Sequence, residues 1–229
     1  MKYTGWELKY FDSSSNFRKY QFSLIKEFIG EKILEVGPGS GNFANNFLIK
    51  VSKKLHLTEI SKDLFEKLKI KFELKKNVEV YSKAISEIDS KFDTICYFDV
   101  LEHIENHELE IKEALKRLNK NGKLIIIVPA FNHLYSYYDK SIGHYRRYEK
   151  EFFQNFIKKN NLIKKKLIYF DSVGYFFLLI NKFVNMKSES KVGLGTIIWN
   201  LLVPISKIID KILFHKFGKS LICVIQNAK

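Results

Sequence analysis

Continuous apolar runs alternate along this chain with segments whose apolar residues recur at helical spacing. A run such as KLIIIVP, which has no polar residue after its first position, suits a parallel strand that is covered on both faces. Helical spacing is clearest at Ile111, Ala114, Leu115 and Leu118. This alternation predicts an α/β fold with a doubly wound, mostly parallel sheet. Seven strands are expected, over residues 32–37, 54–60, 77–81, 92–98, 123–129, 164–170 and 219–226.

We expect one domain over residues 1–229. The 229 residues are 46% hydrophobic, which is enough for one core. Residues 1–30 are expected to form an N-terminal helical segment, with a loop-like SSSN at 13–16 and Gly30 as a C-cap. Residues 171–218 exceed what a connection between strands needs, and they contain two apolar helical stretches before the last strand. We expect a helical cap there and no transmembrane span, because the first stretch is short and the second carries charges and Pro204.

The net charge of +14 raises the question of a nucleic-acid partner. Only four residues are arginine, and the lysines are scattered over the polar faces without forming a stripe. Lys, Phe, Ile and Asn also share AT-rich codons, so genome composition explains the charge better. We expect no nucleic-acid partner, while a weak attraction to anionic lipid or substrate stays open.

The cysteines bear on the compartment. Cys96 and Cys223 lie in apolar runs, so we expect both to be buried and reduced, with neither a disulfide framework nor zinc spacing. The first residues do not read as a signal peptide, because no apolar stretch follows the early charge. A cytoplasmic location is therefore expected, with a peripheral position at the inner face of the membrane as an option.

A glycine-rich motif, LEVGPGSGNF, stands at the first strand-to-helix turn. Gly37 and Gly39 let a ligand approach the backbone, and the following helix would present unpaired N–H groups. A dinucleotide site needs G-x-G-x-x-G, whereas here the third glycine is at 41 and position 42 is Asn. Glu35 would repel a pyrophosphate but can accept from the amino group of a methionine moiety. The spacing favours S-adenosylmethionine (SAM) over NAD, and a tight turn without ligand is the alternative.

Two further strand ends carry polar residues. Glu59 ends the second strand, where a carboxylate can grip both ribose hydroxyls or can simply be solvated. Asp99, Val100 and His103 follow the fourth strand, on the edge at which open α/β sheets bind their ligands. At this position His103 has either a functional or a structural role.

The chain resembles class I SAM-dependent methyltransferases of the small-molecule type. The stretches that carry this resemblance are, in chain order, LEVGPGSGNF, LTEI, FDVLEHIENHE, LNKNGKLIIIVPA and IGHYRRY. The nearest subgroup has VLEHI, VPA and GHYRRY motifs and is often found with glycosyltransferases in polysaccharide and lipid-sugar pathways. The resemblance extends over nearly the whole chain. It implies a Rossmann-like methyltransferase fold and SAM as cofactor.

The resemblance also implies roles for single residues. Glu35, Gly37, Gly39 and Asn42 would surround the methionine half, and Glu59 would contact the ribose. Asp99 and Val100 would lie beside the cofactor, and Tyr20 would close the site. Many relatives have an Asp near the adenine after the third strand, where this chain has Tyr81-Ser82-Lys83-Ala84. Ser82, Ala84 or backbone atoms would serve in its place. The further implied residues are these: Ile60, Ser82, Ala84, Asp99, Val100 and Tyr20.

The acceptor side is expected after the fifth strand. His144 and His103 are the candidate bases for an oxygen acceptor. Arg146 and Arg147 suit a phosphate or carboxylate on the acceptor, unless one of them pairs with Asp139 and holds the loop. Tyr135 and Asp139 complete this set, and we expect no metal ion.

We expect an enzyme that methylates a small molecule, with a saccharide or a lipid-linked intermediate as the candidate acceptors. RNA or protein methylation is the alternative within enzymes. A catalytically silent SAM-fold module that binds a partner is the alternative outside them, although the intact glycine motif and Glu59 argue against it.

Overall fold

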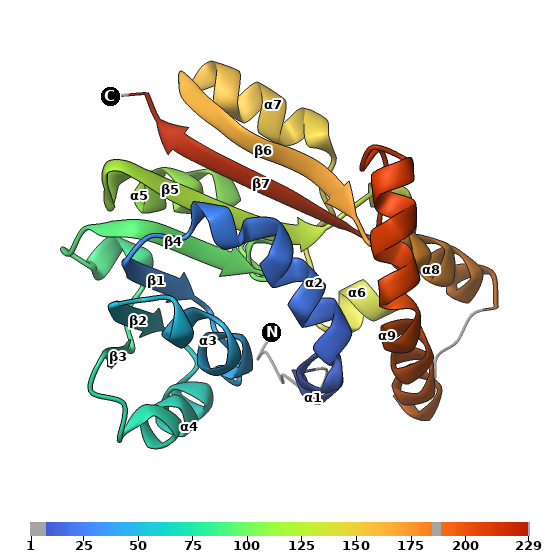
Figure 1. Ribbon diagram of the computed structural model, residues 1–229, viewed down its shortest axis with the longest axis horizontal. Coiled ribbons are helices and arrows are strands. Elements are labelled where there is room, and N and C mark those ends of the chain that lie inside the picture. Colours follow the sequence, from blue (N-terminus) through green and yellow to red (C-terminus); the bar gives the residue numbers. More distant parts are fainter. Residues whose placement is uncertain (1–7, 185–188, 229) are drawn as a thin grey trace.

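The computed structural model describes residues 8–184 and 189–228, and these form a seven-stranded sheet with helices on both faces (Figure 1). The strand order is β3-β2-β1-β4-β5-β7-β6. β7 runs antiparallel to β5 and β6, and the other pairs are parallel. The predicted fold class is thus confirmed. The strands are β1 Lys32–Val36, β2 Lys54–Thr58, β3 Val78–Tyr81, β4 Phe92–Phe98, β5 Leu118–Pro129, β6 Leu162–Phe170 and β7 Ser220–Asn227.

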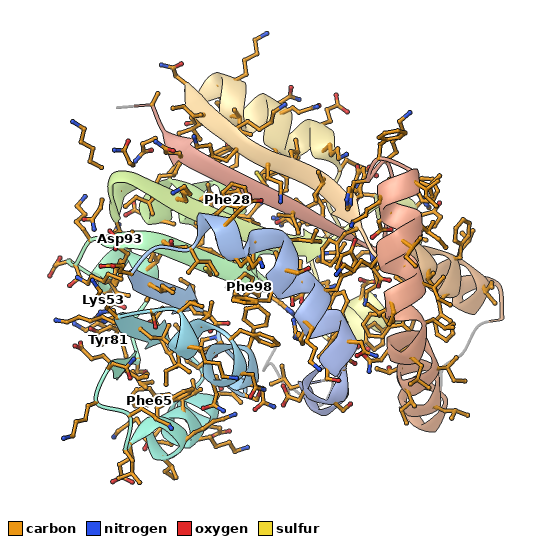
Figure 2. All side chains as sticks on the ribbon, viewed as in Figure 1. Phe28, Lys53, Phe65, Tyr81, Asp93 and Phe98 are labelled. Carbon is orange, nitrogen blue, oxygen red and sulfur yellow. The ribbon has the colours of Figure 1, made fainter. Side chains whose placement is uncertain are left out.

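Side chains of successive strand residues point to opposite faces, so the sheet separates two apolar clusters. α5 and α7 cover one face, while α2, α3, α4 and α9 cover the other. Phe98 of β4, labelled in Figure 2, belongs to the second cluster, and its ring centroid lies 4.6 Å from that of Phe43. The α-helices are α1 Leu8–Ser13, α2 Ser15–Ile25, α3 Asn42–Asn46, α4 Lys62–Phe72, α5 His107–Lys116, α6 Tyr137–Ser141, α7 Lys150–Lys159, α8 Ser172–Val184 and α9 Glu189–Ile212.

Short 3-10 turns follow several strands and helices and shape the loops between them. They are η1 Lys26–Phe28, η2 Leu48–Lys50, η3 Ile85–Glu87, η4 Leu101–His103 and η5 Asn132–Leu134. η4 and η5 come directly after β4 and β5, so they lie at the edge where the parallel strands end.

The expected boundaries hold for most elements. β5 begins at Leu118, five positions before the expected 123, because Leu118 pairs with Phe92 across a register shift. The loop-like SSSN is a junction between helices, with Ser14 as the N-cap residue of α2. Cys96 and Cys223 are buried free thiols, as expected.

Residues 171–218 form two helices, as the sequence predicts. Within the described residues, no helix combines the length and the apolar character needed to cross a bilayer. α9 stands across the end of the sheet at which β4, β5 and β6 end (Figure 1), and it packs against α8, α2 and β6. Trp199 and Val203 are its buried apolar residues.

Candidate active site

Residues with positive φ gather at the carboxyl ends of the parallel strands. Gly37 follows β1 with φ 64°, and Asp99 follows β4 with φ 56°. Phe131 lies two residues beyond β5 with φ 64°, and Asp171 follows β6 with φ 65°. Three of the four are not glycine, and such backbone persists only where the surroundings hold it. Strain of this kind is typical of a functional edge.

The glycine loop needs its glycines for two reasons. Gly37 and Gly39 have φ of 64° and 56°, which residues with a Cβ rarely adopt. A Cβ on Gly37 would lie 2.9 Å from the methyl carbons of Val100. Gly41 has φ 70° and is the N-cap residue of α3, which begins at Asn42. The loop therefore passes close to the turn after β4 and directs the N-terminus of α3 towards the same edge.

The Glu35 carboxylate is buried at this edge, and one of its oxygens lacks a hydrogen-bond donor in the part of the chain that the structure describes. Glu35 is only 2% exposed, and among the described residues its Oε2 atom has no hydrogen-bond partner. Burial raises the pKa of the Glu35 carboxyl to about 8, and the Arg18 guanidinium acts against this rise. A buried acceptor without a donor costs free energy. A ligand with an ammonium group, such as the methionine moiety of SAM, would supply both a donor and a positive charge.

Glu59 is buried and hydrogen-bonded at the end of β2. It is 6% exposed, and its Oε1 accepts a hydrogen bond from the Ser61 backbone N–H over 2.9 Å. Burial raises its pKa, whereas hydrogen bonds from the Ser61, Gly39 and Ile60 backbone lower it. The contact with Gly39 joins Glu59 to the glycine loop, so the two predicted halves of the cofactor site are adjacent.

The predicted adenine side is more open. Ile60 is 78% exposed, Ser82 is exposed, and Ala84 is half-buried where it precedes η3. The Ala84 N–H donates to Oε2 of Glu87 over 2.7 Å. Ser82 and Ala84 thus follow β3 next to the end of β2, which is the side of Glu59 expected for the adenine.

Asp99 and Val100 lie where the sequence predicts. The Asp99 backbone N–H donates to the Ile127 carbonyl over 2.9 Å, which fixes the turn between β4 and η4. Its Oδ2 lies 3.4 Å from Nη1 of Arg18, and Arg18 also acts on Glu35. Arg18 therefore reaches the cofactor edge from α2, a role that the sequence analysis missed.

Tyr20 does not lie where we expected it. Its hydroxyl donates to Oδ2 of Asp210 over 2.8 Å, and its ring packs edge-on against Phe170. Tyr20 is 5% exposed and so fastens α2 to α9 within the core. Helical spacing explains the difference, because Arg18 and Tyr20 are two positions apart and face different sides of α2.

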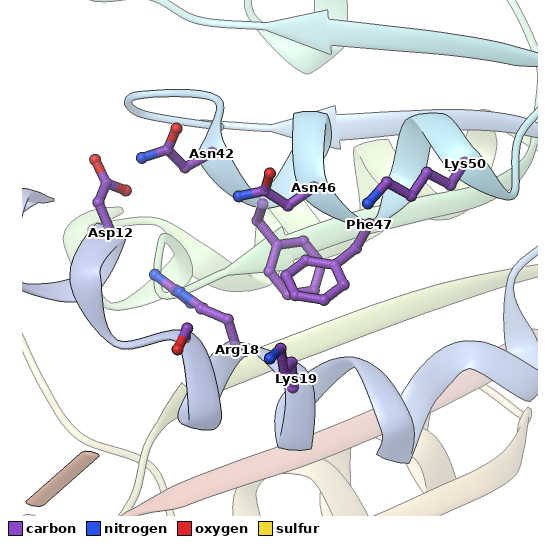
Figure 3. A pocket seen from close by; sticks show the side chains of 9 residues that line it. Asp12, Arg18, Lys19, Asn42, Asn46, Phe47 and Lys50 are labelled. Carbon is purple, nitrogen blue, oxygen red and sulfur yellow. The ribbon is translucent and has the colours of Figure 1, made fainter. Parts of the chain in front are cut away.

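Asn42 begins α3 and accepts a hydrogen bond from Nζ of Lys71. It lines a cavity of about 240 Å³ between α2 and α3 (Figure 3). Asp12, Arg18 and Asn46 line the same cavity, but Glu35, Glu59 and Asp99 do not. The cavity therefore adjoins the predicted cofactor site through Arg18 and Asn42 without coinciding with it.

On the acceptor side the structure brings His103 and His144 together. Their ring centroids are 4.6 Å apart and their planes meet at 77°. His144 Nδ1 lies 2.8 Å from Oδ1 of Asp139. Burial and the neighbouring His144 lower the pKa of His103 to about 4, so His103 is neutral at pH 7. Glu102, which the sequence analysis did not select, lies 3.8 Å from His144 through Oε1 and Nε2.

Neither of the paired arginines is free to grip an acceptor. Arg147 is 6% exposed and donates to Asp139 from Nε over 2.9 Å and from Nη2 over 3.2 Å. Arg146 donates to the carbonyls of Ile104 and Glu105 over 3.1 and 3.0 Å. The sequence left open that one of the two arginines pairs with Asp139 and holds the loop, and Arg147 is that residue. Arg146 is engaged by backbone carbonyls instead.

Tyr135 also stabilises the loop that contains His144. Its hydroxyl donates to the His144 carbonyl over 2.7 Å. Asp139 is fully buried, and it receives hydrogen bonds from Ser136 and Arg147 in addition to its contact with His144. These residues position His144, so their effect on an acceptor is indirect.

A lysine whose side chain is only 13% exposed completes the edge. Lys219 immediately precedes β7, and its Nζ lies 3.9 Å from Oδ2 of Asp171 and 3.5 Å from the ring centroid of Trp199. Burial lowers its pKa to about 8, while Asp171 and Asp99 act in the opposite direction. Trp199 Nε1 donates to Asp171 over 2.7 Å. β7 is antiparallel, so its first residues, and not its last, reach the carboxyl edge.

Comparison with known proteins shows the family and the fold of the chain. Residues 10–164 match the family described as methyltransferase domain. The chain belongs to the methyltransferase domain family. The prediction of a methyltransferase is confirmed at the level of family and fold, while the association with glycosyltransferases is a separate prediction.

The methyltransferase has similar solved structures. One is the N-methyltransferase NodS of Bradyrhizobium japonicum WM9 in complex with S-adenosylhomocysteine, with 13% identity, 95% of this chain and 89% of that chain covered, and a TM-score of 0.61. Another is phosphoethanolamine N-methyltransferase 2 of Haemonchus contortus in complex with SAM, with 15% identity, 97% and 57% covered, and a TM-score of 0.65. These likenesses concern the fold.

A curated relative of the methyltransferase, an uncharacterised protein of Methanocaldococcus jannaschii, is 34% identical over 122 residues. The match covers 52% of this chain and 55% of the relative, so the chain spans about half the length of that protein.

Proposed function

We propose that this protein transfers a methyl group from SAM to a small-molecule acceptor that is bound to, or buried partly in, an anionic membrane. The observation that carries the cofactor half is the unpaired Oε2 of Glu35 beside the glycine loop. SAM is the donor that brings an ammonium to Glu35 and a ribose to Glu59. The named complexes of NodS and of the Haemonchus contortus enzyme contain the related product and SAM itself, which supports the same cofactor.

The methyl transfer requires little covalent chemistry from the protein. A lone pair on the acceptor forms a bond to the methyl carbon while the bond from that carbon to sulfur breaks. The electron pair of the broken bond stays on sulfur, which yields S-adenosylhomocysteine. The acceptor loses its proton to a base or to water. The protein mainly aligns the two partners and excludes water.

His103 and His144 are the candidate bases. Both come from turns at the carboxyl edge, after β4 and β5. The Asp139 carboxylate at 2.8 Å orients the His144 ring and favours a proton on Nδ1, which leaves Nε2 as the acceptor atom. His103, neutral at pH 7, can also accept a proton.

The membrane half of the proposal rests on α9. One face of this helix, with Trp199 and Val203, packs inward, but an apolar row on another face remains in solvent. Lysines 207 and 211 are exposed on the same helix. An apolar face flanked by lysines is typical of helices that lie on anionic membranes. The row comprises Leu194 63%, Ile197 58%, Ile198 45%, Leu201 66%, Ile205 50%, Ile208 63% and Ile212 67% exposed.

The position of this row supports a hydrophobic or lipid-linked acceptor. α9 carries Trp199, which contacts Lys219 and Asp171 at the active edge. A lipid-linked saccharide held at the membrane would therefore approach the edge beside α9. Figure 1 shows α8 and α9 together on this side of the molecule.

Two measurements test the proposal separately. Calorimetric titration with SAM tests the cofactor, and no binding to folded protein would rule out the enzymatic function and favour a silent module. Co-sedimentation with phosphatidylglycerol vesicles tests the membrane. We expect Leu201→Asp to reduce vesicle binding and Ile70→Asp, a matched change on α4 at a residue that is 75% exposed and lies outside the α9 row, to leave it unchanged. Equal binding by both variants would exclude α9 as the docking surface.

A further inference from the structure

Glu102, His103 and His144 form a cluster in which three potential ligand atoms lie within 4.8 Å of one another. Glu102 and His103 belong to η4, directly after β4, and His144 comes from the loop between α6 and α7. The three residues therefore meet at the carboxyl edge although 41 positions separate the histidines.

Glu102 is the exceptional member of this cluster. It is 0% exposed, and within residues 8–184 and 189–228 neither of its carboxylate oxygens has a hydrogen-bond partner. A buried carboxylate is normally paired with a cation or satisfied by donors. Burial raises the pKa of Glu102 well above its ordinary value. A buried carboxylate of this kind, with Oε1 3.8 Å from Nε2 of His144 and a second imidazole in the same cluster, is what a site for a cation would contain.

Both histidines are held as metal ligands usually are. His144 Nδ1 faces Asp139 at 2.8 Å, and Arg147 fixes Asp139 in turn. His103 is hydrogen-bonded by the backbone of Gly143, and its Nδ1 lies on that side of the ring. A histidine that binds a metal through one nitrogen almost always donates from the other to a carboxylate or a carbonyl. In His144 this leaves Nε2 on the side of Glu102, 3.8 Å from its Oε1.

We propose that Glu102, His103 and His144 bind one divalent transition-metal ion. Two nitrogen ligands and one carboxylate suit Zn²⁺, Mn²⁺ or Fe²⁺ better than Ca²⁺ or Mg²⁺, which prefer oxygen ligands. Three ligand atoms that each lie about 2.1 Å from one ion in tetrahedral geometry are about 3.4 Å from one another. From the 4.8 Å within which the three atoms lie here, binding would therefore require a contraction of up to about 1.4 Å.

Three protein ligands leave positions open on the ion. Asp99, which begins the turn that contains Glu102, lies at the cofactor side of this cluster. The open positions would take an oxygen of the acceptor and lower its pKa, so that the two histidines act as ligands and not as bases. This role rests on the proposed methyl transfer, whereas metal binding itself does not. The acceptor class that fits is a hydroxyl or phenol.

The test uses the full chain, stripped with a chelator and measured without SAM or acceptor. Titration calorimetry and native mass spectrometry with Zn²⁺ and Mn²⁺ should show one ion per chain. We expect Glu102→Gln to weaken binding by more than about 100-fold, since loss of a ligand should exceed the 10–100-fold typical of its supporting partners. Glu105→Gln and His133→Gln, which change a carboxylate and a histidine outside the cluster, should bind like the wild type.

Cobalt gives a second readout that tolerates an unstable variant. Co²⁺ bound to imidazole and carboxylate absorbs visible light, and this spectrum should be present in the wild type and lost in His144→Gln or His103→Gln. Wild-type protein that binds none of these ions more tightly than Glu102→Gln does would overturn the proposal. Because SAM is left out, failure here leaves the cofactor titration untouched, and failure of that titration leaves the metal result standing.

Discussion

Arg147 and Asp139 form a buried two-point contact, with Nε on Oδ1 at 2.9 Å and Nη2 on Oδ2 at 3.2 Å, and the same carboxylate also faces Nδ1 of His144. Arg147 thus helps to hold His144 in position through the Asp139 carboxylate, which both side chains contact. Arg147→Met would leave that acid buried without its cation, so we expect a loss of about 3–5 kcal/mol in the free energy of unfolding.

Arg146→Met is the matched control in denaturant unfolding. Arg146 donates to two backbone carbonyls and pairs with no buried acid in these contacts, so its loss should cost about 0.5–1.5 kcal/mol per hydrogen bond. If the two variants unfold at the same denaturant concentration, Arg147 does not hold this loop in the way described.

The raised pKa of Glu35 predicts proton release when SAM binds. With a pKa of about 8, the Glu35 carboxyl is protonated at pH 6.5, where the SAM ammonium is charged. Pairing requires the carboxylate, so binding should expel a proton. The calorimetric enthalpy at pH 6.5 should then vary with the ionisation enthalpy of the buffer, and Glu35→Gln should bind more weakly without this variation. A buffer-independent enthalpy in the wild type would contradict the pairing.

The same carboxyl predicts how stability depends on pH without ligand. Burial raises the folded-state pKa of Glu35 from 4.5 to about 8, so the folded protein binds this proton more tightly than the unfolded chain does. The contribution is complete below about pH 4.5 and is lost as the pH rises towards 8. Denaturant unfolding of Glu35→Gln should lose less stability than the wild type across this window. Parallel curves would show that Glu35 is not the group responsible.

Glu59→Ala should weaken SAM binding by about 1.5–3 kcal/mol, the scale for a lost hydrogen bond to a charged group. Isothermal titration measures this change directly. Glu66→Ala on α4 is the control, because its side chain is 55% exposed and lies beyond the strand end. Unchanged affinity in a folded Glu59→Ala protein would remove the ribose assignment.

Tyr20→Phe separates a structural role from a binding role. The variant keeps the ring against Phe170 but deletes the hydroxyl that donates to Asp210. We expect the free energy of unfolding to fall by about 1.5–3 kcal/mol and SAM affinity to stay the same. A drop in affinity with unchanged stability would return Tyr20 to the cofactor site.

Local patterns were sufficient for much of this molecule. Apolar runs and the glycine motif predicted the strands, and they placed Glu35, Glu59 and Asp99 at one edge, because parallel strands end on the same side. They could not predict which side of α2 faces that edge, so Tyr20 was chosen where Arg18 lies. A signal was present, since Arg18 is one of only four arginines in the chain.

Residues far apart in sequence were harder to predict. Lys219 reaches the edge only because β7 runs antiparallel, and the apolar run that predicts a strand does not reveal its direction. Glu102 stands beside His103 in the sequence, but its burial and its distance from His144 depend on how two loops fold. The roles of Arg146 and Arg147 depend likewise on carbonyls and an acid that tertiary structure brings to them.

The strand order has a consequence for how the chain acquires activity during synthesis. β6 pairs only with β7, which lies between it and β5, so β6 cannot join the sheet until residues 220–227 have been made. The glycine loop and Glu35 would by then have been made, together with β1 to β5. Lys219, Asp171 and the helices between them would have no sheet to rest on. The part of the carboxyl edge that Lys219, Asp171 and α9 form would thus be completed last, after the glycine loop, His103 and His144 have all been made.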